Sequence, residues 1–278
     1  MTEVIIDLHL HSTASDGTLS PAEVVAAARQ AGVRAMALTD HDTLEGAAEA
    51  APAAREAGIE FFPAVELNTD AAGMEIDILG YFAGQPRESF QRLLADRAEA
   101  RIRRAREIVE NLNRLGIDIS YDRVREIAGG VVARPHIAQA MIEKGYATSQ
   151  KDAYDRYIGF GAPAYAERDR LTPEQAIQAV LEGGGLPVVA HPGLVEDDAM
   201  VERLLQAGAA GLEAYYVFHT PEQVQTYREM AARYGAIVTC GTDSHGPGRS
   251  KAQPIGSMPC PAEVLDIFRE KVEEASRR

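Results

Sequence analysis

Short apolar runs alternate with helical segments along both ends of the chain, and this alternation constrains the fold more than any other feature. Each run is five to eight residues long and has the pattern of a buried strand. The seven runs cover residues 4–8, 34–39, 61–67, 75–82, 186–191, 211–217 and 236–241. Because strands that alternate with helices form mostly parallel sheets, we expect an α/β fold, either open or closed into a barrel.

Three of the helical segments begin with the same capping signal. A hydroxyl residue at the N-cap is followed by proline at the first helical position and by glutamate or glutamine at the third. These capping boxes begin at Ser20, Thr172 and Thr220. Glycine allows the left-handed conformation in which many helices stop. The glycines near the opposite ends of three predicted helices are Gly32, Gly183 and Gly235.

Residues 87–166 interrupt the alternation because they are strongly helical, rich in arginine and contain no convincing buried strand. We interpret them as an inserted helical subdomain, with residues 1–86 and 167–278 forming the main domain. One predicted helix carries Arg92, Arg97, Arg101, Arg103, Arg104 and Arg106. Acidic residues recur at helical spacing beside them. This pattern favours a solvent-exposed helix face with ion pairs over a surface that binds the phosphates of a nucleic acid backbone.

Composition excludes several classes of protein. With 28 Lys and Arg against 42 Asp and Glu, the net charge of -14 argues against attraction of nucleic acid by the surface as a whole. Cys240 and Cys260 have no CxxC spacing, so we expect no thiolate metal cluster, no disulfide framework and a cytoplasmic location. No apolar run approaches the length of a membrane span, and nothing indicates a protein partner.

Histidines and carboxylates cluster where the predicted strands end. His9 and His11 are separated by one residue, so both can face one side and bind the same ion. Asp16 follows in the next loop. The other strand ends carry Asp40 with His41, Glu66, His191, and Asp243 with His245. A barrel would bring all these side chains to one place. The alternative is that each histidine is buried only to form a hydrogen bond in the core, and this would have to hold independently at every strand end.

These motifs resemble those of the polymerase and histidinol phosphatase family of metal-dependent phosphoesterases. The resemblance covers essentially the whole chain and implies a distorted seven-stranded (β/α) barrel. It assigns His9, His11, Glu66 and Asp243 to one metal ion, and Asp16, His41 and His245 to another. It further implies that Glu66 and His191 help to hold a third ion. We take His191, Asp243 and His245 as catalytic through the metal ions, and we leave open whether an imidazole such as His219 or a water on the metal donates the proton to the leaving group.

Asp77 departs from the family pattern, because relatives commonly have histidine at its position. A carboxylate there can still bind a divalent ion and favours Mn²⁺ over Zn²⁺, with Fe²⁺ and Mg²⁺ as further candidates. It can equally serve only as a hydrogen-bond acceptor beside a ligand. The sequence therefore leaves two or three divalent ions per chain open.

Three residues outside the metal motifs are candidates for substrate binding. Arg134 and His136 lie in a segment that resembles the branch of 3′,5′-nucleotide bisphosphate phosphatases and 5′-to-3′ exoribonucleases, where it lies over the pocket. Arginine suits phosphate because it binds in a bidentate manner. The alternative is a loop anchor before a helix with Pro135 at its first position. His219 precedes a helix N-terminus, which favours anions.

Charge indicates the reaction class. Two or three divalent ions would exceed the charge of the site carboxylates, so the pocket would be positive inside an acidic protein and would bind phosphate. We expect hydroxide bound to the metal to attack phosphorus. The resemblance implies loss of the 3′-phosphate from nucleoside 3′,5′-bisphosphates, with 5′-to-3′ hydrolysis of short RNA as a second activity. Histidinol-phosphate phosphatase, C–N bond hydrolysis and an inactive metal-binding module remain the alternatives.

Overall fold

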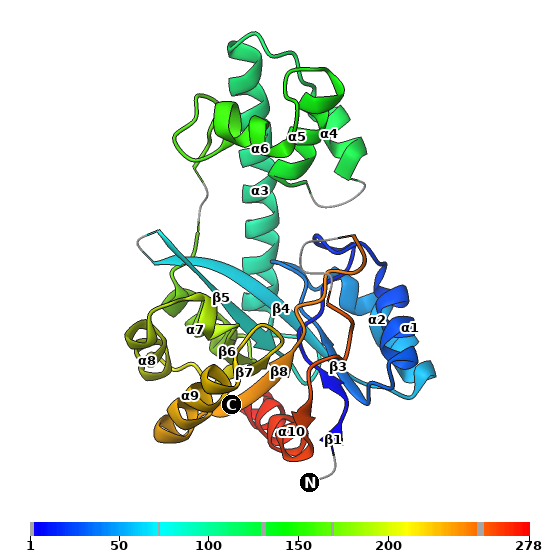
Figure 1. Cartoon of the computed structure of the whole chain (residues 1–278), viewed down its shortest axis with the longest axis vertical. Helices are drawn as coiled ribbons and strands as arrows, with labels where there is room; N and C mark the ends of the chain where they lie inside the picture. Colours follow the sequence, from blue (N-terminus) through cyan, green and yellow to red (C-terminus); the bar gives the residue numbers. More distant parts are fainter. Residues whose placement is uncertain (1–2, 72, 129–131, 168–169, 249–252) are drawn as a thin grey trace. The chain divides into compact units, whose positions relative to one another are not determined.

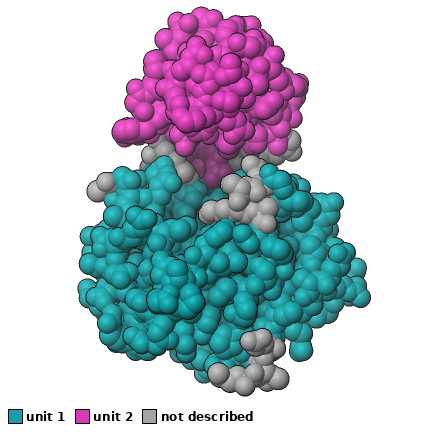
Figure 2. Space-filling model, viewed as in Figure 1, with its two compact units in different colours: residues 1–94, 170–278 teal, residues 95–169 magenta. Residues whose placement is uncertain are grey.

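The protein is described by a computed structural model, which covers residues 3–71, 73–128, 132–167, 170–248 and 253–278. The chain divides into two compact units (Figure 2). Residues 1–94 and 170–278 form the first, which we call the barrel unit, and residues 95–169 form the second, which we call the helical unit. No helix of the described residues is long and apolar enough to cross a membrane.

The barrel unit is built on a mixed seven-stranded sheet (Figure 1). Its strands, in spatial order, are β2 (Ile6–Asp7), β3 (Ala35–Leu38), β4 (Glu60–Ala71), β5 (Met74–Tyr81), β6 (Leu186–Val189), β7 (Gly211–Tyr216) and β8 (Ile237–Gly241). Neighbouring strands are parallel except at β5, which is antiparallel to both β4 and β6. The sheet nearly closes, because the Leu8 N–H donates to the Cys240 carbonyl over 3.0 Å. The predicted α/β barrel is confirmed.

The strands lie where the apolar runs predicted them, with differences at their ends. The first run is broken into β1 (Glu3–Val4), which pairs with β9 (Cys260–Pro261) outside the barrel sheet, and β2 within it. The β4–β5 hairpin is paired along its whole length from Ala64 to Ala71. Only two residues separate these strands. The antiparallel direction of β5 follows from this short connection, since a parallel strand needs a long crossover.

Six α-helices lie entirely within the described residues of the barrel unit. They are α1 (Pro21–Gln30), α2 (Glu45–Ala57), α7 (Pro173–Glu182), α8 (Asp198–Gln206), α9 (Pro221–Tyr234) and α10 (Ala262–Arg277). All three predicted capping boxes are present, at the starts of α1, α7 and α9. Gly235 is left-handed as expected, but the expectation for Gly183 is wrong: its φ is -69°, and Gly184 takes φ +78° instead.

Helix α10 packs against the end of the barrel where the parallel strands begin. The Phe268 ring lies 4.9 Å from both the Phe62 and the Tyr81 rings, in edge-to-face contacts. Phe62 is near the start of β4, and Tyr81 is the last residue of the antiparallel β5, so both belong to the same barrel end. This end is filled by buried aromatic side chains, which leaves the carboxyl ends of the parallel strands for polar groups.

The helical unit has a hydrophobic core of its own. Helix α3 (Glu88–Arg114) continues into it from the barrel unit and is followed by α4 (Tyr121–Ala128), α5 (Arg134–Glu143), α6 (Gln150–Ala153) and a π-helical turn (Tyr154–Ile158). The described residues of this unit contain no strand. The core includes Ile108, Leu112, Val124, Ile137 and Met141. On α3, Arg92, Arg103 and Arg114 each pair with a glutamate four residues earlier, as a solvated face would.

Candidate metal centre

The first group of candidate ligands joins three strands of the barrel. His9 and His11 follow β2, Glu66 lies in β4, and Asp243 follows β8. One ligand atom from each residue lies within 4.8 Å of the others, and all four side chains are buried. His11 Nε2 is 3.1 Å from Glu66 Oε2 and 3.2 Å from Asp243 Oδ1. The structure thus brings together the four residues that the family resemblance assigned to one ion.

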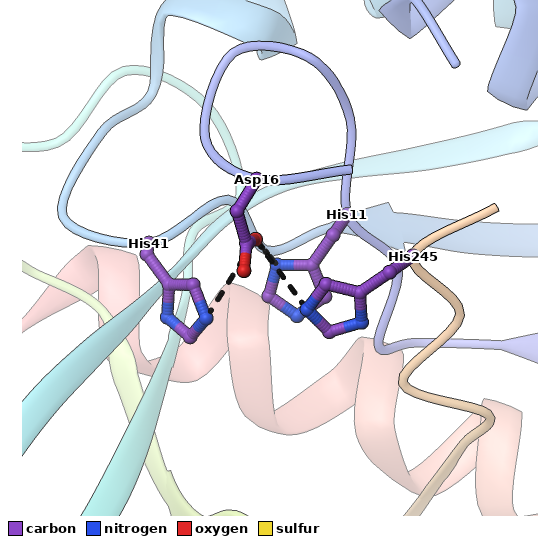
Figure 3. A group of neighbouring side chains, drawn as sticks. All are labelled: His11, Asp16, His41 and His245. Carbon is purple, nitrogen blue, oxygen red and sulfur yellow. Dashed lines mark ion pairs between the residues drawn. The ribbon is translucent and has the colours of Figure 1, made fainter. Parts of the chain in front are cut away.

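The second group lies beside the first and shares His11 with it (Figure 3). Asp16 extends from the loop after His11 toward three imidazoles. Its Oδ1 is 3.8 Å from His11 Nδ1, 3.9 Å from His41 Nε2 and 3.4 Å from His245 Nε2. Asp16, His41 and His245 were expected together, and the structure adds His11 as a member common to both groups.

The third group consists of Glu66, Asp77 and His191. His191 Nε2 lies 3.2 Å from Glu66 Oε1 and 3.9 Å from Asp77 Oδ2. The other oxygen of Asp77 accepts a hydrogen bond from the Asn68 amide over 2.8 Å. Burial is the main reason that the pKa of Asp77 is raised. Asp77 is therefore placed to be a ligand, and the hydrogen bond from Asn68 orients its carboxylate.

Two members of these groups have a left-handed backbone, which is uncommon outside glycine. His191 has φ +26° and Asp243 has φ +53°. Such conformations cost on the order of 1–3 kcal/mol each and persist only where the surroundings enforce them. The Asp243 N–H donates to the His9 carbonyl over 2.9 Å, and the His191 N–H donates to the Glu213 carboxylate over 2.8 Å. These bonds turn both side chains into the barrel mouth.

Several buried polar atoms at the centre face one another without hydrogen bonds. Within the described part of the chain, they are His9 Nε2, His11 Nδ1 and Nε2, His41 Nδ1 and Glu66 Oε2. A buried polar atom without a partner is costly, so native proteins keep few of them. Nitrogen and oxygen donors that converge in this way fit divalent cations, which would satisfy all of them at once.

The mutual charges shift pKa values in opposite directions. Burial opposes ionisation of Glu66, but the nearby His41 and His9 outweigh it and hold the pKa of this carboxyl well below its usual range. Burial also opposes a charge on His11, yet the facing carboxylates of Asp243 and Glu66 raise the pKa of its imidazole to about 10. A divalent ion would replace these protons, because only neutral imidazole is a ligand.

Comparison with known proteins gives concordant results. A family model described as the PHP domain matches residues 7–159. A 5'-3' exoribonuclease of Haemophilus influenzae is 35% identical over 246 residues, which cover 87% of this chain and 90% of that protein. A 3',5'-nucleoside bisphosphate phosphatase of Chromobacterium violaceum is 31% identical over 272 residues, or 95% of each chain. The chain belongs to the PHP domain family.

Solved structures agree with this assignment of the PHP domain. A chain from Bifidobacterium adolescentis, described as a candidate metal-dependent phosphoesterase, superposes with a TM-score of 0.78 at 28% identity and covers 95% of both chains. The family and the relatives' names confirm the prediction of a phosphoester hydrolase. The three groups of ligand atoms agree with metal dependence, without distinguishing one divalent ion from another.

Glu213 is a residue beside the metal centre that the sequence analysis missed. It is fully buried in β7. Its carboxylate accepts from His9 Nδ1 over 3.0 Å, which leaves His9 Nε2 for the metal group. It also accepts the backbone N–H of His191 over 2.8 Å. A charged residue inside an otherwise apolar strand was the available signal, since a buried carboxylate needs a partner.

Asp40 supports the loop that carries Asp16. Its Oδ1 accepts the Ser12 N–H over 2.8 Å and the Ser15 hydroxyl over 2.6 Å, and its Oδ2 accepts the Ser12 hydroxyl over 2.7 Å. Sequence analysis counted Asp40 only as part of a motif with His41. These bonds join the loop after β2 to the end of β3, so they hold Asp16 against the imidazoles of the second group.

Arg134 and His136, both predicted to bind substrate, lie in the helical unit. The Arg134 guanidinium lies 5.1 Å from the centre of the Tyr154 ring, and no carboxylate pairs with it among the described residues. His136 Nδ1 accepts the Ala133 N–H over 3.0 Å at the start of α5. The anchoring role that the sequence left open for this segment is therefore observed for His136, and phosphate binding by either residue stays a prediction.

His219 lies in the barrel unit after β7, and both of its ring nitrogens have partners. Nδ1 donates to the Ala214 carbonyl over 2.9 Å, and Nε2 accepts the Gly193 N–H over 3.1 Å. Burial is the main reason that its pKa is lowered, which keeps the ring neutral. A contact between this imidazole and phosphate would require it to exchange one of these bonds, so its observed role is to join two loops.

Proposed function

We propose that the protein removes the 3′-phosphate from nucleoside 3′,5′-bisphosphates in a reaction that depends on two or three divalent ions. The observation that carries the proposal is the convergence of nitrogen and oxygen atoms in three adjoining ligand groups, several of which are buried and make no hydrogen bond in the described part of the chain. The substrate class is supported by the Chromobacterium violaceum relative, whose likeness extends over 95% of both chains. Cytoplasmic location stays part of the proposal, in keeping with the free, buried Cys240 and Cys260.

Charge explains why such a site would select phosphate esters. The candidate ligands include four carboxylates, from Asp16, Glu66, Asp77 and Asp243. Two or three divalent ions would bring a charge of about +4 to +6 and leave the pocket neutral to positive, although the whole chain has a net charge of -14. A phosphate dianion would therefore be attracted to this pocket and repelled by most of the remaining surface.

The ligand residues define the chemistry. When bound, divalent ions supply a water activated for attack at neutral pH and neutralise charge on the phosphate oxygens. Glu66 belongs to both the first and the third group, so this one residue would help to hold the ions of both. His191, Asp243 and His245 act as ligands that shape the reacting centre. The mixture of imidazole and carboxylate donors suits Mn²⁺, with Fe²⁺, Zn²⁺ and Mg²⁺ as alternatives.

Hydrolysis of short RNA from its 5′ end is the second candidate. The Haemophilus influenzae relative, an exoribonuclease, covers 87% of this chain. The helical unit favours this activity, because residues 95–169 contain 13 Lys and Arg against 12 Asp and Glu and so lack the strong negative charge of the barrel unit. As part of the same proposal, Arg134 and His136 of the inserted segment 87–166 contact a second phosphate of the substrate.

A screen for phosphate release tests the proposal. The chelated protein is assayed with added Mn²⁺ on adenosine 3′,5′-bisphosphate, histidinol phosphate and a short 5′-phosphorylated RNA. We expect turnover of the bisphosphate, no turnover of histidinol phosphate, and no activity on any substrate before the ion is added. Turnover of histidinol phosphate alone would contradict the substrate assignment, and turnover that is independent of divalent ions would contradict the site.

A further inference from the structure

Two exposed apolar side chains in the barrel unit lie at the carboxyl ends of neighbouring parallel strands. Leu194 is 51% exposed in the turn after β6, and Phe218 is 47% exposed in the turn after β7. The other large apolar side chains exposed in the described part of this unit are Ile5, Tyr234 and Ile267. Those three lie before β2, before β8 and in α10, away from the strand ends that carry the candidate ligands.

Aromatic contacts connect Phe218 to the metal centre. Its ring centroid lies 5.5 Å from that of Tyr216, in an edge-to-face arrangement. The Tyr216 ring is in turn 5.4 Å from the His191 ring, and the Tyr216 hydroxyl donates to Asp243 Oδ2 over 3.1 Å. One aromatic ring therefore separates an exposed phenylalanine from two candidate metal ligands.

The turns that carry Leu194 and Phe218 are bonded to each other. The N–H of Gly193, the neighbour of Leu194, donates to Nε2 of His219, the neighbour of Phe218. A Cβ atom at Gly193 would lie 2.7 Å from His219 Nε2, so glycine permits this close approach. The turns that carry the two exposed side chains are therefore held together by a hydrogen bond, although His219 itself has no nitrogen left for a ligand.

We propose that Phe218, assisted by Leu194, is the surface on which the nucleobase of the substrate stacks. The inference rests on the proposed function, because it takes the substrate to be a nucleotide. In a nucleotide the ribose separates the base from the phosphates. Phe218 is likewise separated by one side chain, Tyr216, from the residues that would hold the ions, so a base can reach Phe218 while the phosphate lies at the ions. Every base has an aromatic face, so stacking binds a base without selecting its identity. The hydrogen bond between the two turns and the contact with Tyr216 hold the Phe218 ring in position before the substrate binds.

The chain contains no tryptophan, which makes a fluorescence test direct. The Phe218→Trp variant carries a single indole at the proposed stacking position. Adenosine 5′-phosphate, the product of the proposed reaction, is titrated into the Mn²⁺-loaded protein beside an abasic ribose 5-phosphate analogue. We expect saturable quenching by the adenine nucleotide and none by the abasic analogue. Equal quenching by both ligands, or none by either in a variant that retains phosphatase activity, would overturn the inference.

The Phe160→Trp variant is the matched control. Phe160 is 92% exposed in the helical unit and has no part in the proposed surface. Its indole should not respond to adenosine 5′-phosphate. A response at position 160 together with silence at position 218 would place the base on the helical unit and overturn the inference.

Kinetics of the Phe218→Ala variant give an independent test. We expect KM for adenosine 3′,5′-bisphosphate to rise about tenfold, in keeping with the usual effect of losing one stacked base. The kcat value, and KM for the abasic bisphosphate, should stay the same. Equal effects on both substrates would overturn the stacking role while leaving the proposed function standing. If the unmodified protein hydrolyses neither substrate, the proposed function fails and the inference fails with it.

Discussion

The two units of this chain differ most in how they distribute charge and histidine. The barrel unit contains 15 Lys and Arg against 30 Asp and Glu, whereas the helical unit contains 13 against 12. Six of the seven histidines belong to the barrel unit. Four of its carboxylates face those imidazoles in the candidate metal centre. The barrel unit can therefore bind cations at this centre. Because the rest of the unit is negatively charged, it attracts phosphate where bound cations reverse the local charge.

The units also differ in how their charged side chains are partnered. In the barrel unit, Glu66 and Asp243 are buried against imidazoles, and their ionised forms depend on those neighbours. In the helical unit, many charges form exposed pairs such as Glu99 with Arg103, which contribute little to stability. Arg134 forms no such pair among the described residues, and its guanidinium lies over the Tyr154 ring, a type of contact that three other arginines of this unit also make. From this comparison we propose that the barrel unit carries out the chemistry and that the helical unit supports substrate recognition.

The largest effect is expected from Asp243→Asn, which tests whether the chemistry belongs to the barrel unit. Loss of one anionic ligand should lower kcat/KM by about 10³-fold or more, because activation of water depends on the ions. Circular dichroism should show an unchanged fold. The matched control is Asp266→Asn, an exposed carboxylate paired with Arg269 on α10, which should retain full activity. Near-normal rates in Asp243→Asn would remove this residue from the site.

A smaller effect is expected from Glu213→Gln, in which the side chain keeps its shape and loses its charge. Residues that orient metal ligands typically contribute about 10- to 100-fold to metal affinity or activity, and we expect a loss in that range for Mn²⁺ affinity. Calorimetric titration of Mn²⁺ into the metal-free protein measures it. Glu60→Gln, which removes an outer ion pair with Arg269, is the control. Equal affinities in both variants would show that Glu213 has only a packing role.

Metal binding should depend on pH in a direction set by the imidazoles. The facing carboxylates raise the pKa of His11 to about 10, so this ring is protonated at neutral pH until an ion replaces the proton. Mn²⁺ affinity should therefore fall as the pH is lowered, by about tenfold per pH unit for each proton displaced. Calorimetry in buffers of different ionisation enthalpy measures the released protons. Affinity that is constant between pH 6 and 8 would contradict protonated imidazoles in the metal-free site.

The change with the mildest expected effect, Arg134→Ala, tests the role of the helical unit. We expect KM for a nucleoside bisphosphate to rise about tenfold, as for the loss of one charge-assisted hydrogen bond, while KM for a monophosphate changes little. Arg103→Ala, whose guanidinium pairs with Glu99, is the control and should behave as the unmodified protein. Equal effects of Arg134→Ala on both substrates would place Arg134 away from the second phosphate.

Much of the fold was predictable because its signals are local. The boxes at Ser20, Thr172 and Thr220 depend on residues three positions apart, and the structure contains all of them. The His9 and His11 pair was recognisable because alternate residues of an extended chain face the same side. Local signals failed at Gly183, because three glycines follow one another there and any of them can end a helix. The sequence does not show which one is left-handed, and in the structure it is Gly184.

Residues whose partners lie far away in the chain were harder to predict. Glu213 is 204 residues from His9, and nothing beside it in the sequence shows that its carboxylate will accept from that imidazole. Asp40 was noticed only as a neighbour of His41, although it fixes the loop that presents Asp16. Such contacts follow from which strand ends become neighbours, and that order exists only in the folded sheet.

The sequence by itself determined the strands, the helix starts and the identity of the candidate ligands, because periodicity, capping and ligand chemistry act over a few residues. Tertiary structure alone decided how those ligands are shared. It made His11 common to the first two groups and Glu66 common to the first and third. It also joined the turns after β6 and β7 beside Tyr216. The physical reason is that closure of the barrel brings distant strand ends within the few ångströms over which cations, hydrogen bonds and aromatic rings interact.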